Sequence, residues 1–300
     1  MKGRTLIALA AAAAVALPAS TADAQLSYPG IPWTNLLPPL PSPNEPQPGP
    51  VPNCRNASIK CIKVEIRRMR RVQDRFGCDH RAVFATTYLT LTKVLKRMLD
   101  EGVLNLDDRK YLYTEDALFA NFYFRTIRAW NRGDPVPAAW RIAFESAENG
   151  NHFGAQDMLL GINAHVQNDM PFVIASLGLR TPDGESRKPD HDEINKVLAR
   201  AYQPVVDAVS ARYDRSLGLT NAAQAPIDDI AGLEAVRAWR ELVWRNAERL
   251  VNAKTDAQRA SVARSIESTA AITARLIAVV RVPGYGATRD RYCQEQLGAR

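Results

Sequence analysis

The stretch "IKCIKVEIRRMRRVQDRF", residues 59–76, decides the fold class. Its apolar residues stand at positions 59, 62, 66, 69, 72 and 76, a spacing that gathers them on one face of an α-helix. Gly77 follows directly and favours the end of that helix. The stretch therefore predicts an amphipathic helix whose apolar face packs on a core.

The same periodicity continues toward the C-terminus, whereas strand signals are scarce. Further helices are predicted at 83–100, 107–133, between Pro137 and Gly150, at 154–167, at 172–177, at 190–218 with a kink near Pro204, at 227–252 and at 256–280. Between two of them, Asn168 to Pro171 are expected to form a break. The sequence predicts one all-α domain of about eight or nine helices over residues 54–300.

The N-terminal stretch "MKGRTLIALAAAAAVALPASTADAQ" has the order of a secretory signal peptide. Lys2 and Arg4 precede an apolar run, and Ala22-Asp23-Ala24 fits a cleavage site for small residues. We expect residues 1–24 to be removed after Ala24 and the protein to be exported, either periplasmic or secreted. The apolar run is short for a membrane anchor, and no later segment has the length of a transmembrane span.

Residues 25–53 are dense in proline, so they are expected to form an extended arm rather than helix or sheet. This arm could contact another protein or the surface of its own domain. The chain carries a formal net charge of +7 but no nucleic-acid-binding motif, so no nucleic-acid partner is expected.

Four cysteines remain after the expected cleavage: Cys54, Cys61, Cys78 and Cys293. An even number in an oxidising compartment favours disulfides over zinc-binding thiolates. Four cysteines allow three pairings. Cys54 with Cys61 is the local choice, and Cys78 with Cys293 would then join the end of the domain to its start.

The segment "GINAHVQNDMPFVIASLG", residues 161–178, places several polar residues in an apolar helix. His165 and Asp169 are four residues apart and would share a helix face, where they could bind a metal ion or form an acid–base pair. Alternatively, Asp169 caps the helix that starts near Pro171. Amides at Asn163, Gln167 and Asn168 need partners if they are buried.

The fragment "LLGINAHVQNDMP" resembles the signature of a bacterial all-helical family of unknown function, G-[MI]-N-A-H-[IV]-x-x-D-[LM]-P. Other segments resemble the same family over about residues 75–280: "DHRAVFATTYLTLT", "EDALFANFYF", "PAAW" and "HDEINKVL". The resemblance implies an all-α fold and draws together the following positions: Asp79, Phe84, Tyr88, Asp116, Trp140, His165, Asp169, His191 and Asn195. It implies no activity.

A shorter fragment, "HVQNDMP", is similar to the H-x3-D-proline helix of zinc-dependent phospholipases C and single-strand nucleases. The chain departs from that group. It has only four histidines, Gln25 would stand at the mature N-terminus instead of a ligand tryptophan, and Asn195 replaces an expected glutamate. At most one or two divalent ions, such as zinc, could be bound.

Three functions stay open. The first is a binding or structural protein with a buried polar site for a small-molecule or lipid-like ligand, with Asn163, Asn168, Asn195 and Trp140 as binding residues. The second is a metal-dependent hydrolase of a phosphoester or another ester, with His165, Asp169, His191 and Asp116 as ligands and Asp79 as a ligand or base. The third is a metal-free enzyme in which Asp169 orients His165 as the base.

Overall fold

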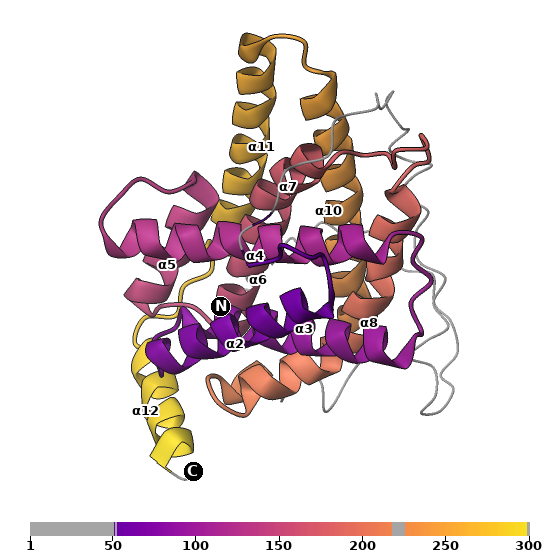
Figure 1. Ribbon diagram of the computed structural model, residues 1–300. Helices are drawn as coiled ribbons and strands as arrows, with labels where there is room; N and C mark the ends of the chain where they lie inside the picture. Colours follow the sequence, from indigo (N-terminus) through magenta and orange to yellow (C-terminus); the bar gives the residue numbers. More distant parts are fainter. Residues whose placement is uncertain (1–50, 52, 218–225, 299–300) are drawn as a thin grey trace. The chain divides into compact units, whose positions relative to one another are not determined.

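The computed structural model describes residues 51, 53–217 and 226–298. In this part the chain forms ten α-helices and one π-helix, and β pairing is limited to two isolated bridges (Figure 1). The all-α prediction is confirmed. The expected signal peptide 1–24 and nearly all of the proline-rich segment 25–53 lie outside the described residues. None of the described helices is long and apolar enough to cross a membrane.

Four helices precede the polar segment: α2 (Ile59–Phe76), α3 (Ala82–Glu101), α4 (Arg109–Asn131) and α5 (Ala138–Asn149). Their ends follow local signals. Asp108 caps α4, since its carboxylate accepts a hydrogen bond from the backbone N–H of Tyr111 at 2.9 Å. Gly102 ends α3 with a φ of 70°, a left-handed conformation that glycine adopts at little energetic cost.

The polar segment forms one continuous rod of α6 (Gly154–Asn163), a π-helix η2 (Ala164–Asp169) and α7 (Met170–Leu177). The predicted break from Asn168 to Pro171 is wrong, because the backbone stays helical through these residues. Asp169 does not cap α7 either. Its backbone is helical and its side chain makes no cap hydrogen bond.

The later helices are α8 (Lys188–Ser210), which contains Pro204, then α10 (Pro226–Asn252), α11 (Asp256–Ile277) and α12 (Tyr285–Gly298). Helix α12 was not predicted. Both favoured disulfides are present: Cys54–Cys61 and Cys78–Cys293. The second joins α12 to the turn before α3.

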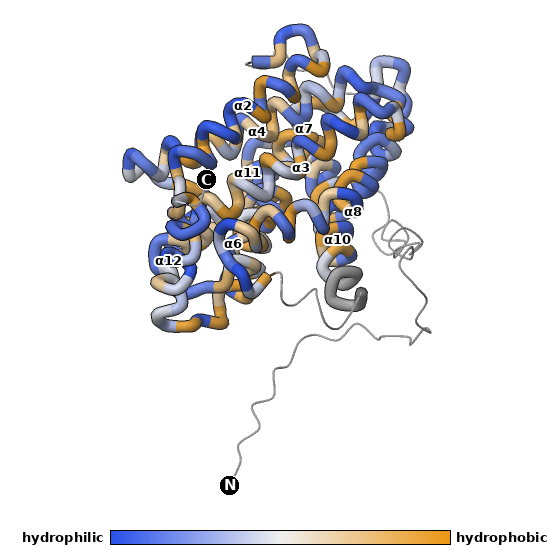
Figure 2. The backbone as a smooth tube through the Cα atoms, turned by 90° about the horizontal axis from the view of Figure 1, so that it is seen from below, coloured by the Kyte–Doolittle hydropathy of each residue, from blue (hydrophilic) through white to orange (hydrophobic). Residues whose placement is uncertain are grey.

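The rod α6–η2–α7 lies among the other helices. Its α6 part contacts α3, α5 and α11, whereas η2 contacts α4, α5, α10 and α11. Along most helices, hydrophobic and hydrophilic residues alternate with the helical repeat, as Figure 2 shows. The largest buried side chains, Trp140 and Tyr123, lie in the cluster that covers the side of η2 facing α3, α4 and α5. The fold therefore surrounds the polar residues of η2.

Candidate functional site

Pro171 explains why the rod contains a π-helix. A proline has no N–H to donate to the carbonyl of Gln167 four residues earlier, and its ring crowds that carbonyl. The backbone widens, and the N–H of Met170 donates to the carbonyl of His165, five residues back. Such π-helical turns occur often at functional sites.

Asp169 organises the centre of η2. Its Oδ2 accepts hydrogen bonds from Nδ1 of His165 at 3.0 Å and from Nε1 of Trp140 at 2.9 Å, and its Oδ1 accepts from the amide of Asn168 at 2.8 Å. All four side chains are buried. Since the carboxylate oxygens of Asp169 act as acceptors, Nδ1 of His165 carries the hydrogen and Nε2 keeps its lone pair.

Five aromatic rings surround the imidazole of His165, and we name this group the aromatic cage: Phe84, Tyr88, Phe119, Tyr123 and Trp140. Phe119 stacks on the imidazole with ring centroids 3.5 Å apart and planes within 4°. Burial lowers the pKa of His165, although the hydrogen bond and charge of Asp169 oppose this shift. The imidazole is therefore neutral at neutral pH.

Three buried polar atoms at the aromatic cage have no hydrogen-bond partner within the described part of the chain: Nε2 of His165, the hydroxyl of Tyr88 and Oδ2 of Asp116. The Tyr88 and His165 rings lie 4.9 Å apart. Burial raises the pKa of Tyr88, and among charges Asp116 adds most to this shift. Burial also raises the pKa of Asp116 well above its usual value, followed by the charges of Glu65 and Glu115. Tyr88 therefore stays protonated at neutral pH, and burial favours the protonated form of Asp116.

Residues 62–280 match a family described as a family of unknown function, DUF5995. The chain belongs to this family. The match spans well over half of the chain and includes the aromatic cage and the whole rod. No curated protein and no solved structure matches the chain, so the similarity to zinc-dependent phospholipases C and nucleases has no support.

Two predicted binding residues of the DUF5995 region form bonds within the fold. The amide of Asn163 donates to the carbonyl of Ala270 in α11 at 2.9 Å, and its Oδ1 accepts from Gln167 at 2.7 Å. Asn168 donates to Asp169. These amides fix the rod against α11 and orient Asp169, which satisfies the need for partners that their burial creates.

His191 and Asn195 face Arg240 of α10 rather than the aromatic cage. Nε2 of His191 donates to the carbonyl of Arg240 at 3.1 Å, and Oδ1 of Asn195 accepts from Nε of Arg240 at 3.0 Å. Burial lowers the pKa of His191 well below its usual value, and the positive charges of Arg240 and Lys188 lower it further. A cation in direct contact with this histidine disfavours a second cation beside it.

The described residues contain no group of three or more His, Cys, Asp or Glu side chains that could hold a metal ion. The four ligands predicted for a metal site are therefore not brought together as a set. His165 and Asp169 bond to each other, Asp116 lies near Tyr88, and His191 lies against Arg240. The geometry gives the metal-dependent hydrolase no ligand set.

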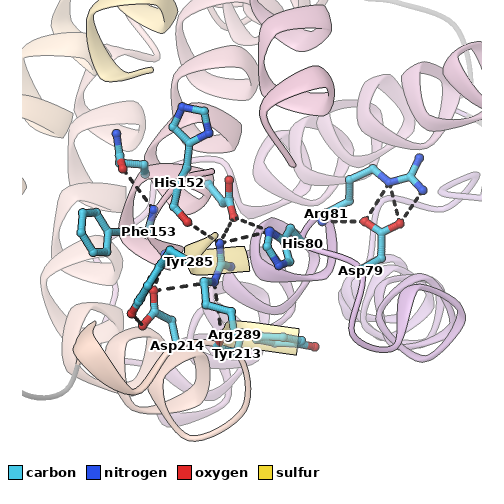
Figure 3. A network of polar contacts seen from close by, with 12 residues as sticks. Asp79, His80, Arg81, His152, Phe153, Tyr213, Asp214, Tyr285 and Arg289 are labelled. Carbon is cyan, nitrogen blue, oxygen red and sulfur yellow. Dashed lines mark hydrogen bonds and ion pairs between the residues drawn. The ribbon is translucent and has the colours of Figure 1, made fainter. Parts of the chain in front are cut away.

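Asp79, predicted as a catalytic residue, is paired with Arg81 at the start of α3 (Figure 3). Burial alone would raise the pKa of Asp79, but its hydrogen bonds with Arg81 and the charge of Arg81 outweigh burial and lower it. The carboxylate is thus held ionised in an ion pair, and no bond joins it to His165.

A second buried cluster was missed at the sequence level, and we name it the Arg289 cluster: Arg289, His80, Asp157, Asp214 and the backbone carbonyl of His152 (Figure 3). Nη1 of Arg289 lies 2.6 Å from Oδ2 of Asp157 and 3.2 Å from Nδ1 of His80. Arg289 comes from α12, beyond the part that matches DUF5995. A sequence signal existed, since Arg289 is four residues before Cys293 and shares its helix face.

Proposed function

We propose that this chain is a binding protein whose aromatic cage takes up a small, neutral, polar molecule. One observation carries the proposal: three helices, α3, α4 and η2, each bring one buried polar atom without a described partner to the cage. Native proteins rarely leave such atoms unpaired, because each costs about 1–3 kcal/mol. A bound molecule would satisfy them.

The protonation states define the chemistry of this ligand. Nε2 of His165 accepts a hydrogen bond, whereas the hydroxyl of Tyr88 and the protonated form of Asp116, which burial favours, can donate. The cage contains no arginine or lysine bonded to these three residues among those described, and Glu65, Glu115 and Asp169 lie close enough to act on Tyr88. No described cation bonded to these three residues would offset the charge of an anion. A neutral molecule with one donor and one acceptor, such as an alcohol or amide, fits best.

A second candidate function is favoured by the bond between His165 and Asp169. Asp169 fixes the imidazole in the tautomer whose Nε2 is a base, so Nε2 could take a proton from a bound hydroxyl or C–H group while Asp169 stabilises the resulting imidazolium. This metal-free mechanism uses the same ligand position. Asp169→Asn would then abolish turnover while ligand binding is reduced less, since only catalysis requires the proton transfer.

We also propose that the protein is exported. We expect the chain to lose residues 1–24, and the two disulfides among its four cysteines suit an oxidising compartment. Intact-mass measurement of the full chain expressed in a bacterial host tests this. A periplasmic or secreted product that begins at Gln25 with both disulfides is expected, and an unprocessed cytoplasmic product would refute export.

Ligand binding is tested by ¹⁵N NMR of the histidine side chains with acetamide and glycerol as neutral probes and acetate as the anionic comparison. We expect the Nε2 resonance of His165 to move with the neutral probes, and to move much less with acetate. The Nε2 atoms of His80, His152 and His191 are bound by protein groups and serve as internal controls.

Tyr88→Phe is the matched variant, because it removes one donor and keeps the ring. It should weaken the response of His165 to the probes. A His165 resonance that ignores every probe, or that moves equally with acetate, would overturn the proposal.

A further inference from the structure

The C-terminal end of α11 exposes an unusual group of hydrophobic side chains, which we name the apolar edge: Ile272, Leu276, Val279 and Val280. Of six large hydrophobic residues that are exposed in the described part, these four lie within nine positions, with exposed fractions of 52%, 69%, 72% and 53%. Ile272 and Leu276 are four residues apart and lie on one side of the helix, and Val279 and Val280 follow in the turn after Ile277. The opposite side is buried through alanines, so the larger residues face outward.

Hydrogen bonds fix the backbone of the turn that follows α11, so the hydrophobic side chains exposed there have defined positions. Nε2 of His152 donates to the carbonyl of Ala278 at 3.2 Å. The amide of Gln156 donates to the carbonyls of Ile277 at 2.8 Å and Val280 at 2.9 Å. The start of α6 thus fixes the backbone that presents Val279 and Val280.

A cavity of about 370 Å³ lies beside this turn, between α5 and the end of α11. Residues that line it include Ile142, Ser146, Asn149, His152, Arg275 and Arg281. Arg275 and Arg281 are exposed, and neither guanidinium bonds to another described residue. Glu145 also lines the cavity, but it is paired with Arg141 at 3.3 Å. The cavity therefore carries two positive charges that no described residue neutralises.

His152 adds an unpaired atom to this cavity. It is only 2% exposed, and its Nε2 must carry the hydrogen because the carbonyl of Ala278 can only accept. Nδ1 is then an acceptor, and it has no hydrogen-bond partner in the described residues. Two guanidinium groups suit an oxyanion, and Nδ1 suits a hydroxyl group of the same ligand.

We propose that this end of α11 binds the surface of an anionic phospholipid membrane. A lipid phosphate would lie between Arg275 and Arg281, a headgroup hydroxyl would donate to His152, and the apolar edge would enter the hydrocarbon boundary. The cavity and the apolar edge adjoin through Val279, which belongs to both. Apolar side chains beside cationic ones are the combination that interfacial membrane binding requires.

The test is co-sedimentation of the purified protein with vesicles. We expect binding to vesicles of phosphatidylcholine mixed with phosphatidylglycerol, weakening with salt, and little binding to phosphatidylcholine alone. Arg275→Gln and Arg281→Gln should each weaken partitioning about fivefold, from the usual contribution of one basic residue near an anionic surface. Leu276→Ser should weaken it about tenfold or more, since a leucine side chain no longer leaves water.

Matched control variants keep these results specific. Val103→Ser and Arg109→Gln alter an exposed apolar and an exposed basic residue elsewhere, and should leave partitioning unchanged. All variants change exposed side chains, so thermal unfolding should stay the same.

Three outcomes would overturn the proposal. The first is equal binding to both vesicle types, and the second is binding of soluble glycerol phosphate without vesicle binding, which would mark a site for a small oxyanion. The third is self-association that Leu276→Ser abolishes while vesicles are not bound, which would mean that a second copy of the chain covers the apolar edge.

Discussion

The Arg289 cluster and the aromatic cage both bury histidine beside carboxylates, yet they balance charge in opposite ways. In the Arg289 cluster, one guanidinium lies 2.6 Å from Asp157 and 3.7 Å from Asp214. At the aromatic cage, no described arginine or lysine bonds to His165, Asp169 or Asp116. Burial instead favours the neutral forms of His165 and Asp116.

In the Arg289 cluster the charged groups bond to one another and hold the fold, whereas polar groups at the aromatic cage are available to bond a ligand. An ion pair such as Arg289–Asp157 is worth little beyond what apolar residues would provide, but removal of one partner is severe because a buried charge stays behind. Neutral unpaired groups behave differently. Removing such a group lowers the free energy of unfolding little. A buried group without a partner is expected where a bound molecule supplies the hydrogen bond.

The largest effect is expected from Arg289→Met. It leaves Asp157 and Asp214 buried without their cation, so the free energy of unfolding should fall by roughly 3–5 kcal/mol. Denaturant unfolding measures this. Arg291→Met, an exposed position on the same helix, is the control and should change little. A loss for Arg289→Met as small as that of the control would mean that the cluster does not hold α12.

A smaller effect concerns pH and the acidic groups near the aromatic cage. Burial raises the pKa of Glu65 from 4.5 to about 7, although Arg68 opposes the shift. Between these values the folded state holds a proton that the unfolded chain has released, so stability falls as pH rises. The share of Glu65 in this fall is about 3 kcal/mol, at 1.36 kcal/mol for each pKa unit.

Glu65→Gln isolates this share, because it keeps an acceptor for Arg68 and removes the proton equilibrium. Burial also raises the pKa of Glu115 to about 7, so Glu115 makes the unfolding free energy fall with pH in both the wild type and Glu65→Gln. Histidines with lowered pKa values, such as His165, give a slope of the opposite sign below 6.5 in both proteins. The measured quantity is therefore the difference between the two pH profiles of unfolding free energy. Parallel profiles would contradict the raised pKa of Glu65.

Close packing of the aromatic cage gives the third prediction. A Cβ added at Gly161 would lie 2.3 Å from Cγ of Phe84, so Gly161→Ala should displace Phe84 and cost about 1–3 kcal/mol. Gly232 lies within α10 with open space around it, and Gly232→Ala should stabilise by about 0.5–1 kcal/mol. Chemical denaturation of both variants measures the change in unfolding free energy and its sign. Stabilisation by both would show that the cage yields to the added methyl group.

Local signals in the sequence were sufficient for most helices. The apolar spacing of 59–76 and Gly77 predicted α2 with its observed bounds, and cysteine pairing followed from the local choice of Cys54 with Cys61. The pairing of His165 with Asp169 also followed from a spacing of four residues. These features depend on neighbours along one helix, which periodicity describes.

Features that depend on distant helices could not be read in this way. Pro171 suggested a break, whereas burial of η2 among four helices keeps the backbone helical as a π-turn. His191 was grouped with His165 through the resemblance to the helical family, and only the packing of α8 on α10 shows that Arg240 is its neighbour. Phe119 gives no local sign that it stacks on an imidazole.

The smallest expected effect comes from replacing tyrosine by phenylalanine at two buried positions. It tests the comparison directly, because one tyrosine hydroxyl has a hydrogen-bond partner and the other has none among the described groups. Tyr213 and Tyr88 are both buried, with 2% and 5% exposure. The hydroxyl of Tyr213 accepts from Thr86 at 3.1 Å, whereas that of Tyr88 has no partner among the described groups. In protein refolded free of small molecules, Tyr213→Phe should lower the unfolding free energy by about 1 kcal/mol, and Tyr88→Phe should leave it unchanged or raise it. Equal losses would mean that the Tyr88 hydroxyl already has a partner, so that the aromatic cage is a closed network and holds no place for a ligand.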